Sequence, residues 1–217
     1  MRILILCLCL GTALFFGYKT GQKPKTDIVL HKEFPVTTRK TFVFVIYAYN
    51  QSLWVDRTLR SIFEQEYDYY RIVFIDDGSK DNTFAAACEF IHENNQESKT
   101  LMIRNETKLG LTACLRQVVQ SLLDQEIVIP LHAKDWLAHS GALTRMNAIF
   151  QNPDVWIAST SGIKYPSFEK RPLGFEGCYA ALFKQLPEGS IDLQQVSAGK
   201  AIHVSDVLFV ANTATPD

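Results

Sequence analysis

The stretch Tyr70–Thr83, YRIVFIDDGSKDNT, joins an uninterrupted apolar run to two carboxylates, a glycine and several turn-forming residues. β-Branched and aromatic side chains fill the positions from Ile72 to Ile75, a pattern typical of a strand buried on both faces of a parallel sheet. Asp76 and Asp77 follow at the carboxyl end of this predicted strand. In open α/β sheets that edge binds ligands, because its loops open into a crevice beside helix N-termini. The stretch therefore predicts an α/β sheet with an acidic edge.

The residues after Asp77 predict a turn that leads into a helix. Gly78 permits a sharp turn, and Asp81 or Asn82 can cap a helix that begins near Phe84. Two acidic residues before a glycine also occur as a simple solvated turn. The context favours a binding edge, because another apolar run lies about 30 residues upstream, the length of a βαβ unit.

Apolar patterns alternate between strand and helix on both sides of this stretch. Buried strands are predicted at 42–47, 100–103 and 127–131, helices at 53–63, 84–95, 110–123 and 140–150, and a further strand at 155–158. Ser52 can cap the first helix, and Pro130 requires either that its strand ends there or that pairing stops early. The alternation predicts a three-layer α/β domain with a mainly parallel sheet. Beyond Ser159 the regularity fades, with a strand or short helix expected at 177–184 and an apolar run at 206–211.

The N-terminus carries a separate apolar segment, the charge-free run Ile3–Tyr18, ILILCLCLGTALFFGY. Its aromatic end favours an uncleaved anchor over a cleaved signal peptide, although roughly 16 residues are fewer than the ~20 that span a bilayer. Lysines after the run favour a cytoplasmic domain, whereas Arg2 and the amino terminus favour the opposite orientation. We expect a single-pass anchor or signal-like segment in residues 1–20, a polar linker in 21–40, and one membrane-associated domain in 41–217.

Composition sets further bounds on function. The 217 residues are 47% hydrophobic and 21% charged with a net charge of −1, which predicts a packed core and disfavours a nucleic-acid surface. The five cysteines lack a CxxC pairing, so we expect reduced core thiols and neither a disulfide framework nor a zinc site.

Four stretches between Thr41 and Phe150 together resemble the family 2 glycosyltransferases, inverting enzymes of the GT-A fold that use nucleotide-diphosphate sugars. FVFVIYAYN is similar to the family's opening strand and Pro-Thr-Tyr-Asn turn, RIVFIDDGSKDNT to its nucleotide-binding turn, LGLTACLRQ to a helix start, and LHAKDWL to the metal-binding Asp-x-Asp segment. The resemblance implies a GT-A α/β sandwich and a hexosyltransferase-type activity in cell-envelope or surface glycan synthesis. The partners it implies are a nucleotide-sugar donor and an acceptor that is a glycan, a lipid or a protein.

The resemblance also implies which residues contact the donor. A carboxylate can accept hydrogen bonds from the base or ribose. The turn that begins at Asp76-Asp77, called the acidic turn below, supplies two carboxylates. The implied nucleotide-sugar contacts are Tyr49, Asn50, Asp76, Asp77, Gly78, Ser79, Arg116 and Lys134. Tyr47 and Ala48 replace the proline and threonine of the family's turn, which alters part of the base pocket.

The metal motif departs from the family pattern, because His132-Ala133-Lys134-Asp135 stands where the family has Asp-Ala-Asp-Asp. Most GT-A enzymes hold Mn²⁺ or Mg²⁺ at this motif to stabilise the diphosphate leaving group. Lys134 would repel a divalent cation. Either Lys134, with Arg116 in place of the family's asparagine, neutralises the diphosphate without metal, or the domain no longer transfers sugar. His132 and Asp135 remain candidate metal ligands.

Inverting transfer also needs a general base for the acceptor hydroxyl. The family supplies it from a Glu-Asp pair, and Ser205-Asp206 is the best-placed match, so Asp206 is the candidate base with a helix cap or surface carboxylate as the alternative. A second hypothesis is a catalytically inactive domain that binds nucleotide or serves as a scaffold. A phosphoacceptor receiver domain is disfavoured, because it would need an aspartate where His132-Ala133 stands.

Overall fold

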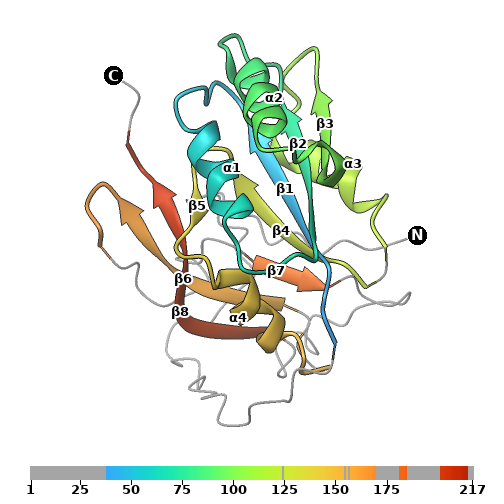
Figure 1. Ribbon diagram of the computed structural model, residues 1–217, viewed down its shortest axis with the longest axis vertical. Coiled ribbons are helices and arrows are strands. Elements are labelled where there is room, and N and C mark those ends of the chain that lie inside the picture. Colours follow the sequence, from blue (N-terminus) through green and yellow to red (C-terminus); the bar gives the residue numbers. More distant parts are fainter. Residues whose placement is uncertain are drawn as a thin grey trace, which may run out of the picture.

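The computed structural model describes residues 38–123, 125–153, 155, 157–169, 181–184 and 201–214. Within these residues eight strands form one sheet in the order β3-β2-β1-β4-β7-β6-β8-β5 (Figure 1). The strands are β1 Phe42–Ala48, β2 Tyr70–Asp76, β3 Thr100–Arg104, β4 Ile127–His132, β5 Trp136–Leu137, β6 Ile157–Tyr165, β7 Ala181–Lys184 and β8 Ala201–Asn212. The helices are α1 Val55–Phe63, α2 Thr83–Glu93, α3 Leu111–Val119 and α4 Ala142–Ile149, with a short 3₁₀ turn at Glu97–Lys99.

The half of the sheet that contains β1 to β4 is parallel, as the sequence predicts. Strand β1 lies in its centre between β2 and β4, and β3 pairs with the far side of β2. Ala48 is in register with Asp76, and Tyr47 is in register with His132. The acidic turn and the altered metal motif therefore begin at the same edge of the sheet.

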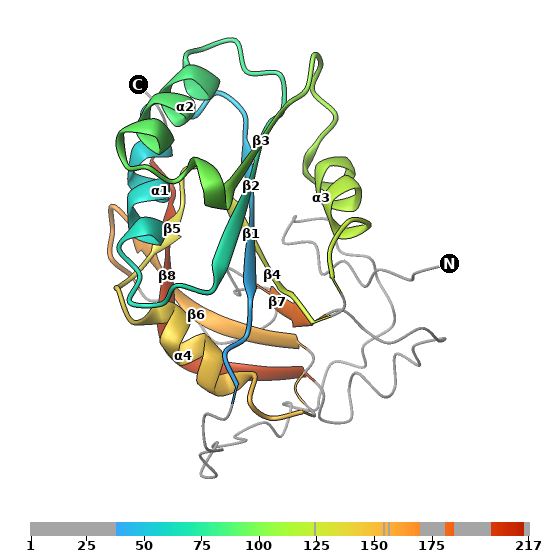
Figure 2. The ribbon, with the colours of Figure 1, turned by 45° about the vertical axis from the view of Figure 1, so that its right-hand side comes forward.

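Helices cover both faces of this half (Figure 2). Phe42, Phe44 and Ile46 of β1 pack in one cluster with the buried faces of α1 and α2. Val43 and Val45 point to the opposite face and pack in a second cluster with α3. Successive residues of a strand point to opposite faces, so a strand covered on both sides must be apolar at every position. This confirms the prediction made from the uninterrupted apolar runs.

Pro130 lies inside β4, where its missing N–H is harmless. The N–H groups of Ile127 and Ala133 donate to carbonyls on the β1 side, so the odd-numbered residues of β4 face β1 and Pro130 faces the opposite side. On that side β7 pairs in the described residues at Ile127 and Val128 alone. Pairing stops before Pro130, which is one of the two predicted outcomes.

The other half of the sheet is mixed. Strand β7 is antiparallel to both β4 and β6, β6 is parallel to β8, and β5 is antiparallel to β8. The predicted strand at 155–158 is the beginning of the longer β6, and the apolar run at 206–211 is part of β8. Both strands are long because they pair with each other, and their register shifts twice near Ser161.

Some predicted helix ends are wrong. Helix α1 begins at Val55 without a side-chain cap, and Ser52, the predicted cap, donates its backbone N–H to Asp81 across the loop, 3.1 Å away. Leu53 is 72% exposed and does not belong to the apolar face of α1. At the start of α2 the two predicted alternatives are resolved, because Asp81 and not Asn82 accepts the N–H of Thr83. Helix α3 ends at Val119, short of the predicted residue 123.

The predicted anchor and most of the predicted linker lie outside the described residues. In the part of the chain that the structure describes, no helix is long and apolar enough to cross a membrane. Cys88 and Cys114 are free thiols, as expected, while Cys7, Cys9 and Cys178 fall outside the described part.

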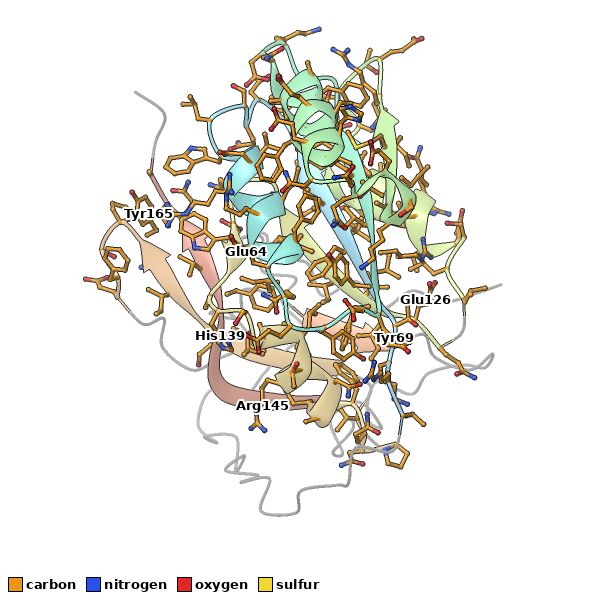
Figure 3. The ribbon with its side chains drawn as sticks, in the orientation of Figure 1. Glu64, Tyr69, Glu126, His139, Arg145 and Tyr165 are labelled. Atoms are coloured by element: carbon orange, nitrogen blue, oxygen red, sulfur yellow. The ribbon has the colours of Figure 1, made fainter. Side chains whose placement is uncertain are left out.

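An ion pair joins the amino-terminal ends of β2 and β4. The Arg71 guanidinium donates two hydrogen bonds of 2.7 Å to the carboxylate of Glu126, which is labelled in Figure 3. This carboxylate is buried and also accepts the N–H of Leu123 at 2.8 Å. Burial alone would raise the pKa of Glu126, but the Arg71 and Leu123 hydrogen bonds outweigh burial and lower it. A lowered pKa stabilises the fold above the unfolded-state pKa and loses that contribution as the pH falls through the folded-state value.

We therefore expect Glu126→Gln to lower the free energy of unfolding at pH 7 by about 1–2 kcal/mol, because the Arg71 pair is lost and Arg71 is itself partly solvated. The difference should shrink at pH 3, because this pH lies below the unfolded-state pKa of glutamate, where the stability contributed by a lowered pKa is progressively lost. Urea unfolding at both pH values measures the difference. Glu97→Gln, at the exposed His92 pair, is the control and should have no measurable effect. An equal loss of stability at pH 3 would contradict this account of Glu126.

Candidate functional site

Asp77 is the centre of a buried network at the carboxyl edge of the sheet. Its side chain is fully buried, and both oxygens accept hydrogen bonds from other parts of the chain. Oδ1 accepts hydrogen bonds from the Asn105 amide at 2.8 Å, the Leu109 N–H at 2.9 Å and the Cys114 thiol at 3.5 Å. Oδ2 accepts hydrogen bonds from the Tyr47 hydroxyl at 3.0 Å and the Gly110 N–H at 2.8 Å. One carboxylate thus joins β1, β2, the 105–110 loop and the start of α3.

The charges in this network follow from its hydrogen bonds. Burial would raise the pKa of Asp77, but the donors at Leu109, Asn105, Gly110 and Tyr47 together lower it, so the group is a carboxylate at neutral pH. Burial and the nearby Asp77 charge raise the pKa of Cys114 to about 11. The same two causes raise the pKa of Tyr47. Cys114 and Tyr47 are therefore neutral donors at neutral pH and not nucleophiles.

Asp76 is also fully buried, but it has acceptor capacity left. Oδ1 accepts the N–H of Ser79 at 3.3 Å. Oδ2 lies 3.3 Å from Nε of Arg104, yet the N–H is not aligned with it, and Oδ2 has no hydrogen-bond partner within the described residues. Of the two carboxylates in the turn, Asp76 is the one with an oxygen that accepts no hydrogen bond in the described residues, and that oxygen is buried in an ion pair with Arg104.

The rest of the acidic turn holds the loop between β1 and α1. Ser79 accepts the N–H of Asn50 at 3.0 Å, and Thr83 accepts the N–H of Gln51 at 2.7 Å. In return, Lys80 donates its N–H to the side chain of Asn50 at 2.8 Å. Asn50 has a φ of +53°, a conformation that asparagine tolerates better than most residues. These contacts fix Asn50 at the edge of the site.

Gly78 lets the acidic turn approach the 105–110 loop closely. Its φ is +76°, and a Cβ at this position would lie 3.1 Å from the carbonyl carbon of Thr107. Gly110 also has a positive φ, +90°, but a Cβ there would meet nothing within 4 Å. A side chain at Gly78 would therefore meet both a disfavoured φ and a steric contact, whereas a side chain at Gly110 would meet the disfavoured φ alone.

The residues of the altered metal motif do not fit a divalent cation. Asp135 is buried, its Oδ1 accepts the N–H of Asn212 at 2.9 Å, and its carbonyl accepts from Thr58 at 2.8 Å. Burial and the charge of Lys134 lower the pKa of His132, whose ring packs edge-on against Tyr47. No group of three or more His, Cys, Asp or Glu side chains in the described residues could hold a metal ion.

A shallow hollow connects the β1–α1 loop to the altered motif. It is lined by Asn50, Gln51, Ser52, Leu53, Trp54, Lys134 and Ala214. Lys134 is half-buried, and within the described residues no carboxylate pairs with it. Two predicted donor contacts, Asn50 and Lys134, therefore face one space.

The other predicted residues are distributed as follows. Tyr49 lies beside this edge, where the Lys108 ammonium lies 3.7 Å from the centre of its ring. Arg116 is exposed in the last turn of α3. The backbone of Asp206 lies in β8 at the irregular register with β6, and its side chain is outside the described residues, so its role as a base stays a prediction. Sequence reasoning missed Arg104, although its place at the end of the predicted strand 100–103 was a usable signal.

Comparison with known proteins agrees with this architecture. The model of the family described as "Glycosyl transferase family 2" matches residues 43–200. The chain belongs to this family. The match includes the acidic turn, the 105–110 loop and the altered metal motif, so the hydrogen-bond network of Asp77 is built from the family's own segments.

Solved structures share the fold of this glycosyltransferase-family chain. PcManGT, a mannosyltransferase from Pyrobaculum calidifontis in complex with GDP-Man and Mn²⁺, superimposes with a TM-score of 0.61 at 18% identity, over 84% of this chain and 59% of that one. TarS of S. aureus in complex with UDP-GlcNAc gives 0.60 at 13% identity, over 82% and 60% of the two chains. A curated relative, uncharacterized protein MT1568 of Mycobacterium tuberculosis (strain CDC 1551 / Oshkosh), is 34% identical over 114 residues. That match covers 51% of this chain and 32% of the relative.

Gly78→Ala should lower the free energy of unfolding by about 2 kcal/mol, because it adds both a disfavoured φ and a contact with backbone atoms that cannot move aside. Gly110→Ala should cost about 1 kcal/mol, from its φ alone. Gly141→Ala is the control and should be close to neutral, since its Cβ would meet the His139 ring at an ordinary 3.5 Å. Thermal or urea unfolding of the three variants measures this order, and equal losses at Gly78 and Gly141 would contradict the proposed close approach.

Asp77→Asn should destabilise the domain by about 2–4 kcal/mol, because an amide nitrogen in place of one oxygen cannot accept the buried donors. It should also open the network around Cys114. In the wild type this thiol should react slowly with iodoacetamide at pH 8, given its burial and raised pKa. Peptide mapping of the alkylated cysteines gives the rate, with the partly exposed Cys88 as the internal control. An unchanged Cys114 rate would show that Asp77 does not close this network.

Proposed function

We propose that this domain transfers a sugar from a nucleoside diphosphate donor to an acceptor hydroxyl with inversion at the anomeric carbon. In that reaction the hydroxyl attacks the anomeric carbon from the face opposite the diphosphate, and its proton passes to a base. The bond from that carbon to the diphosphate breaks, and the electron pair leaves with the diphosphate. Membership of the family supports a glycosyl transfer, and the chain spans only part of its relatives, so the activity of the whole protein is part of the proposal.

The observation that carries the proposal is the shared hollow of Asn50 and Lys134 at the carboxyl edge of the sheet. The leaving diphosphate gains negative charge as its bond to the sugar breaks, and a preorganised cation stabilises that charge. Lys134 is a half-buried ammonium without a carboxylate partner in the described part of the chain. It can supply this cation in place of a metal ion.

The donor's nucleoside would then lie over the acidic turn. Oδ2 of Asp76 accepts no hydrogen bond in the described residues but is buried beside Arg104. A hydroxyl or N–H of a ribose or base would bond this oxygen if the exposed Arg104 side chain moved aside. Asp77, whose oxygens are occupied, contributes by holding the 105–110 loop and Tyr47 in place. Lys108, held over the ring of Tyr49, adds positive charge at the same edge.

The remaining assignments follow from the sequence and from the resemblance to the family. Mn²⁺ or Mg²⁺ is usual in the family, but the contacts of Asp135 and the charge of Lys134 disfavour it here. Asp206 is proposed as the base. The apolar N-terminal segment is proposed as a membrane anchor, with the domain on the cytoplasmic side and a role in cell-envelope or surface glycan synthesis.

A second candidate function is a domain that binds nucleotide or serves as a scaffold without transferring sugar. The observation that favours it is the internal use of the acidic residues, because Asp77 and Asp135 hold the fold together through contacts that a catalytic carboxylate would leave open. Sugar transfer from any donor would exclude this alternative.

Lys134 separates these functions. We expect Lys134→Ala to weaken binding of UDP or GDP about tenfold or more, and the wild-type affinity to fall with added salt, because an ammonium–phosphate attraction is screened. EDTA should change neither affinity nor diphosphate release. Calorimetric titration and a donor-panel release assay measure both, with Lys99→Ala as a half-buried lysine control at the opposite edge of the sheet. Activity that EDTA abolishes would refute the role of Lys134 as the cation.

A further inference from the structure

Four aromatic side chains from three segments form a cluster beside the hollow. Trp54 precedes α1, Trp136 lies in β5, Tyr165, which is labelled in Figure 3, ends β6, and Phe168 follows the turn after it. The rings of Trp54 and Trp136 are stacked with centroids 6.4 Å apart, and Tyr165 packs edge-on against both at 5.9 and 5.4 Å. Phe168 extends the cluster, 5.8 Å from Tyr165. We call these four residues the aromatic cluster.

The aromatic cluster is buried on its inner side and open on its outer side. Trp136 is buried, Trp54 and Tyr165 are half-buried, and Phe168 is 69% exposed. Phe168 also has a φ of +56°, a conformation that an aromatic residue rarely adopts. An exposed phenylalanine held in this conformation contributes little to the core, so packing alone does not explain it.

The guanidinium of Arg57 covers the ring of Trp136, and the N–H groups of this guanidinium stay available to a ligand. Its guanidinium carbon lies 3.8 Å from the centre of the Trp136 ring and 5.1 Å from that of Tyr165. Within the described residues no carboxylate forms an ion pair with this guanidinium, and Asp56 instead accepts the backbone N–H of Arg57 at 2.7 Å. A guanidinium stacked on a ring is fixed in position while its N–H groups remain free to bind a carboxylate in bidentate fashion.

We infer that the aromatic cluster and Arg57 bind an acidic glycan, which is the acceptor of the transfer reaction. That this glycan is the acceptor rests on the proposed function. The apolar C–H face of a pyranose ring packs well on an exposed aromatic surface, since both lose contact with water. Arg57 would bind the carboxylate of a uronic acid residue. Trp54 belongs both to the aromatic cluster and to the hollow that contains Lys134, so a glycan on the cluster would direct its end toward the donor.

A membrane surface is the other kind of partner that exposed tryptophan, tyrosine and phenylalanine can favour. The geometry favours the glycan. Trp136 is sequestered under Arg57, and the surface continues into a polar hollow lined by Asn50, Gln51 and Ser52, which suits hydroxyl groups better than lipid chains.

The test is a titration of the full chain with trigalacturonic acid and with maltotriose, followed by tryptophan fluorescence without any nucleotide. Two of the three tryptophans belong to the aromatic cluster, so binding there should change the emission. We expect saturable binding of trigalacturonic acid. Phe168→Ala and Arg57→Gln should each weaken it about fivefold or more, and maltotriose should bind more weakly and be indifferent to Arg57→Gln.

Two matched variants control for changes outside the site. Leu123→Ala removes an apolar side chain with the same 69% exposure as Phe168, and Arg60→Gln removes the arginine that lies over Phe90 on the same helix as Arg57. Both should bind trigalacturonic acid like the wild type, and circular dichroism melts should show all variants folded. If Phe168→Ala is unfolded, Tyr165→Phe with Arg57→Gln takes its place.

Three results would overturn the inference. They are the absence of binding to either sugar, equal weakening by the control variants, and binding to phosphatidylglycerol vesicles that Phe168→Ala removes while sugar binding is absent. Because no nucleotide is present, loss of nucleotide affinity or of transfer in the Lys134 experiments leaves this result unchanged. Sugar binding in a chain without transfer would overturn the proposed function and keep the glycan site.

Discussion

The carboxylate of Asp77 is the constraint on which the carboxyl edge of this sheet depends. It is a buried charge whose desolvation is offset by donors from β1, the 105–110 loop and α3. A buried carboxylate without these partners would be strongly unfavourable, so the loops that supply them must close around it. Once they have closed, Gly78 brings the acidic turn against Thr107, and Ser79 and Thr83 hold the β1–α1 loop. The edge is thus preorganised before any ligand arrives.

This arrangement gives the two aspartates of the acidic turn different roles. The two adjacent aspartates are chemically alike in sequence, yet one holds the fold and the other retains an acceptor atom, Oδ2 of Asp76. The altered metal motif shows a similar division. Asp135 supports the C-terminal end of β8 through Asn212, while Lys134 faces the hollow. In the proposed function the diphosphate is therefore stabilised by a lysine, in a family whose fold is shared with a Mn²⁺-bound mannosyltransferase.

The aromatic cluster beside this edge is a property of tertiary structure alone. Trp54 and Trp136 are separated by about 80 residues, and Tyr165 arrives from a strand whose length is set by its pairing with β8. No local pattern links them. In the sequence, Arg57 is an ordinary polar residue of an amphipathic helix. Its guanidinium has a fixed position only because the ring of Trp136 lies beneath it.

The sequence by itself determined the parallel half of the sheet, because a strand covered on both faces needs an unbroken apolar run, as at 42–47 and 72–75. It also determined the family, whose segments stand in order along the chain. The sequence did not predict β5 or the full lengths of β6 and β8, because mixed pairing between distant segments has no local period. Only the tertiary structure decided which carboxylate has both oxygens hydrogen-bonded, because the donors at Leu109 and Gly110 are backbone N–H groups, and a motif in the sequence does not say which side chain accepts from them.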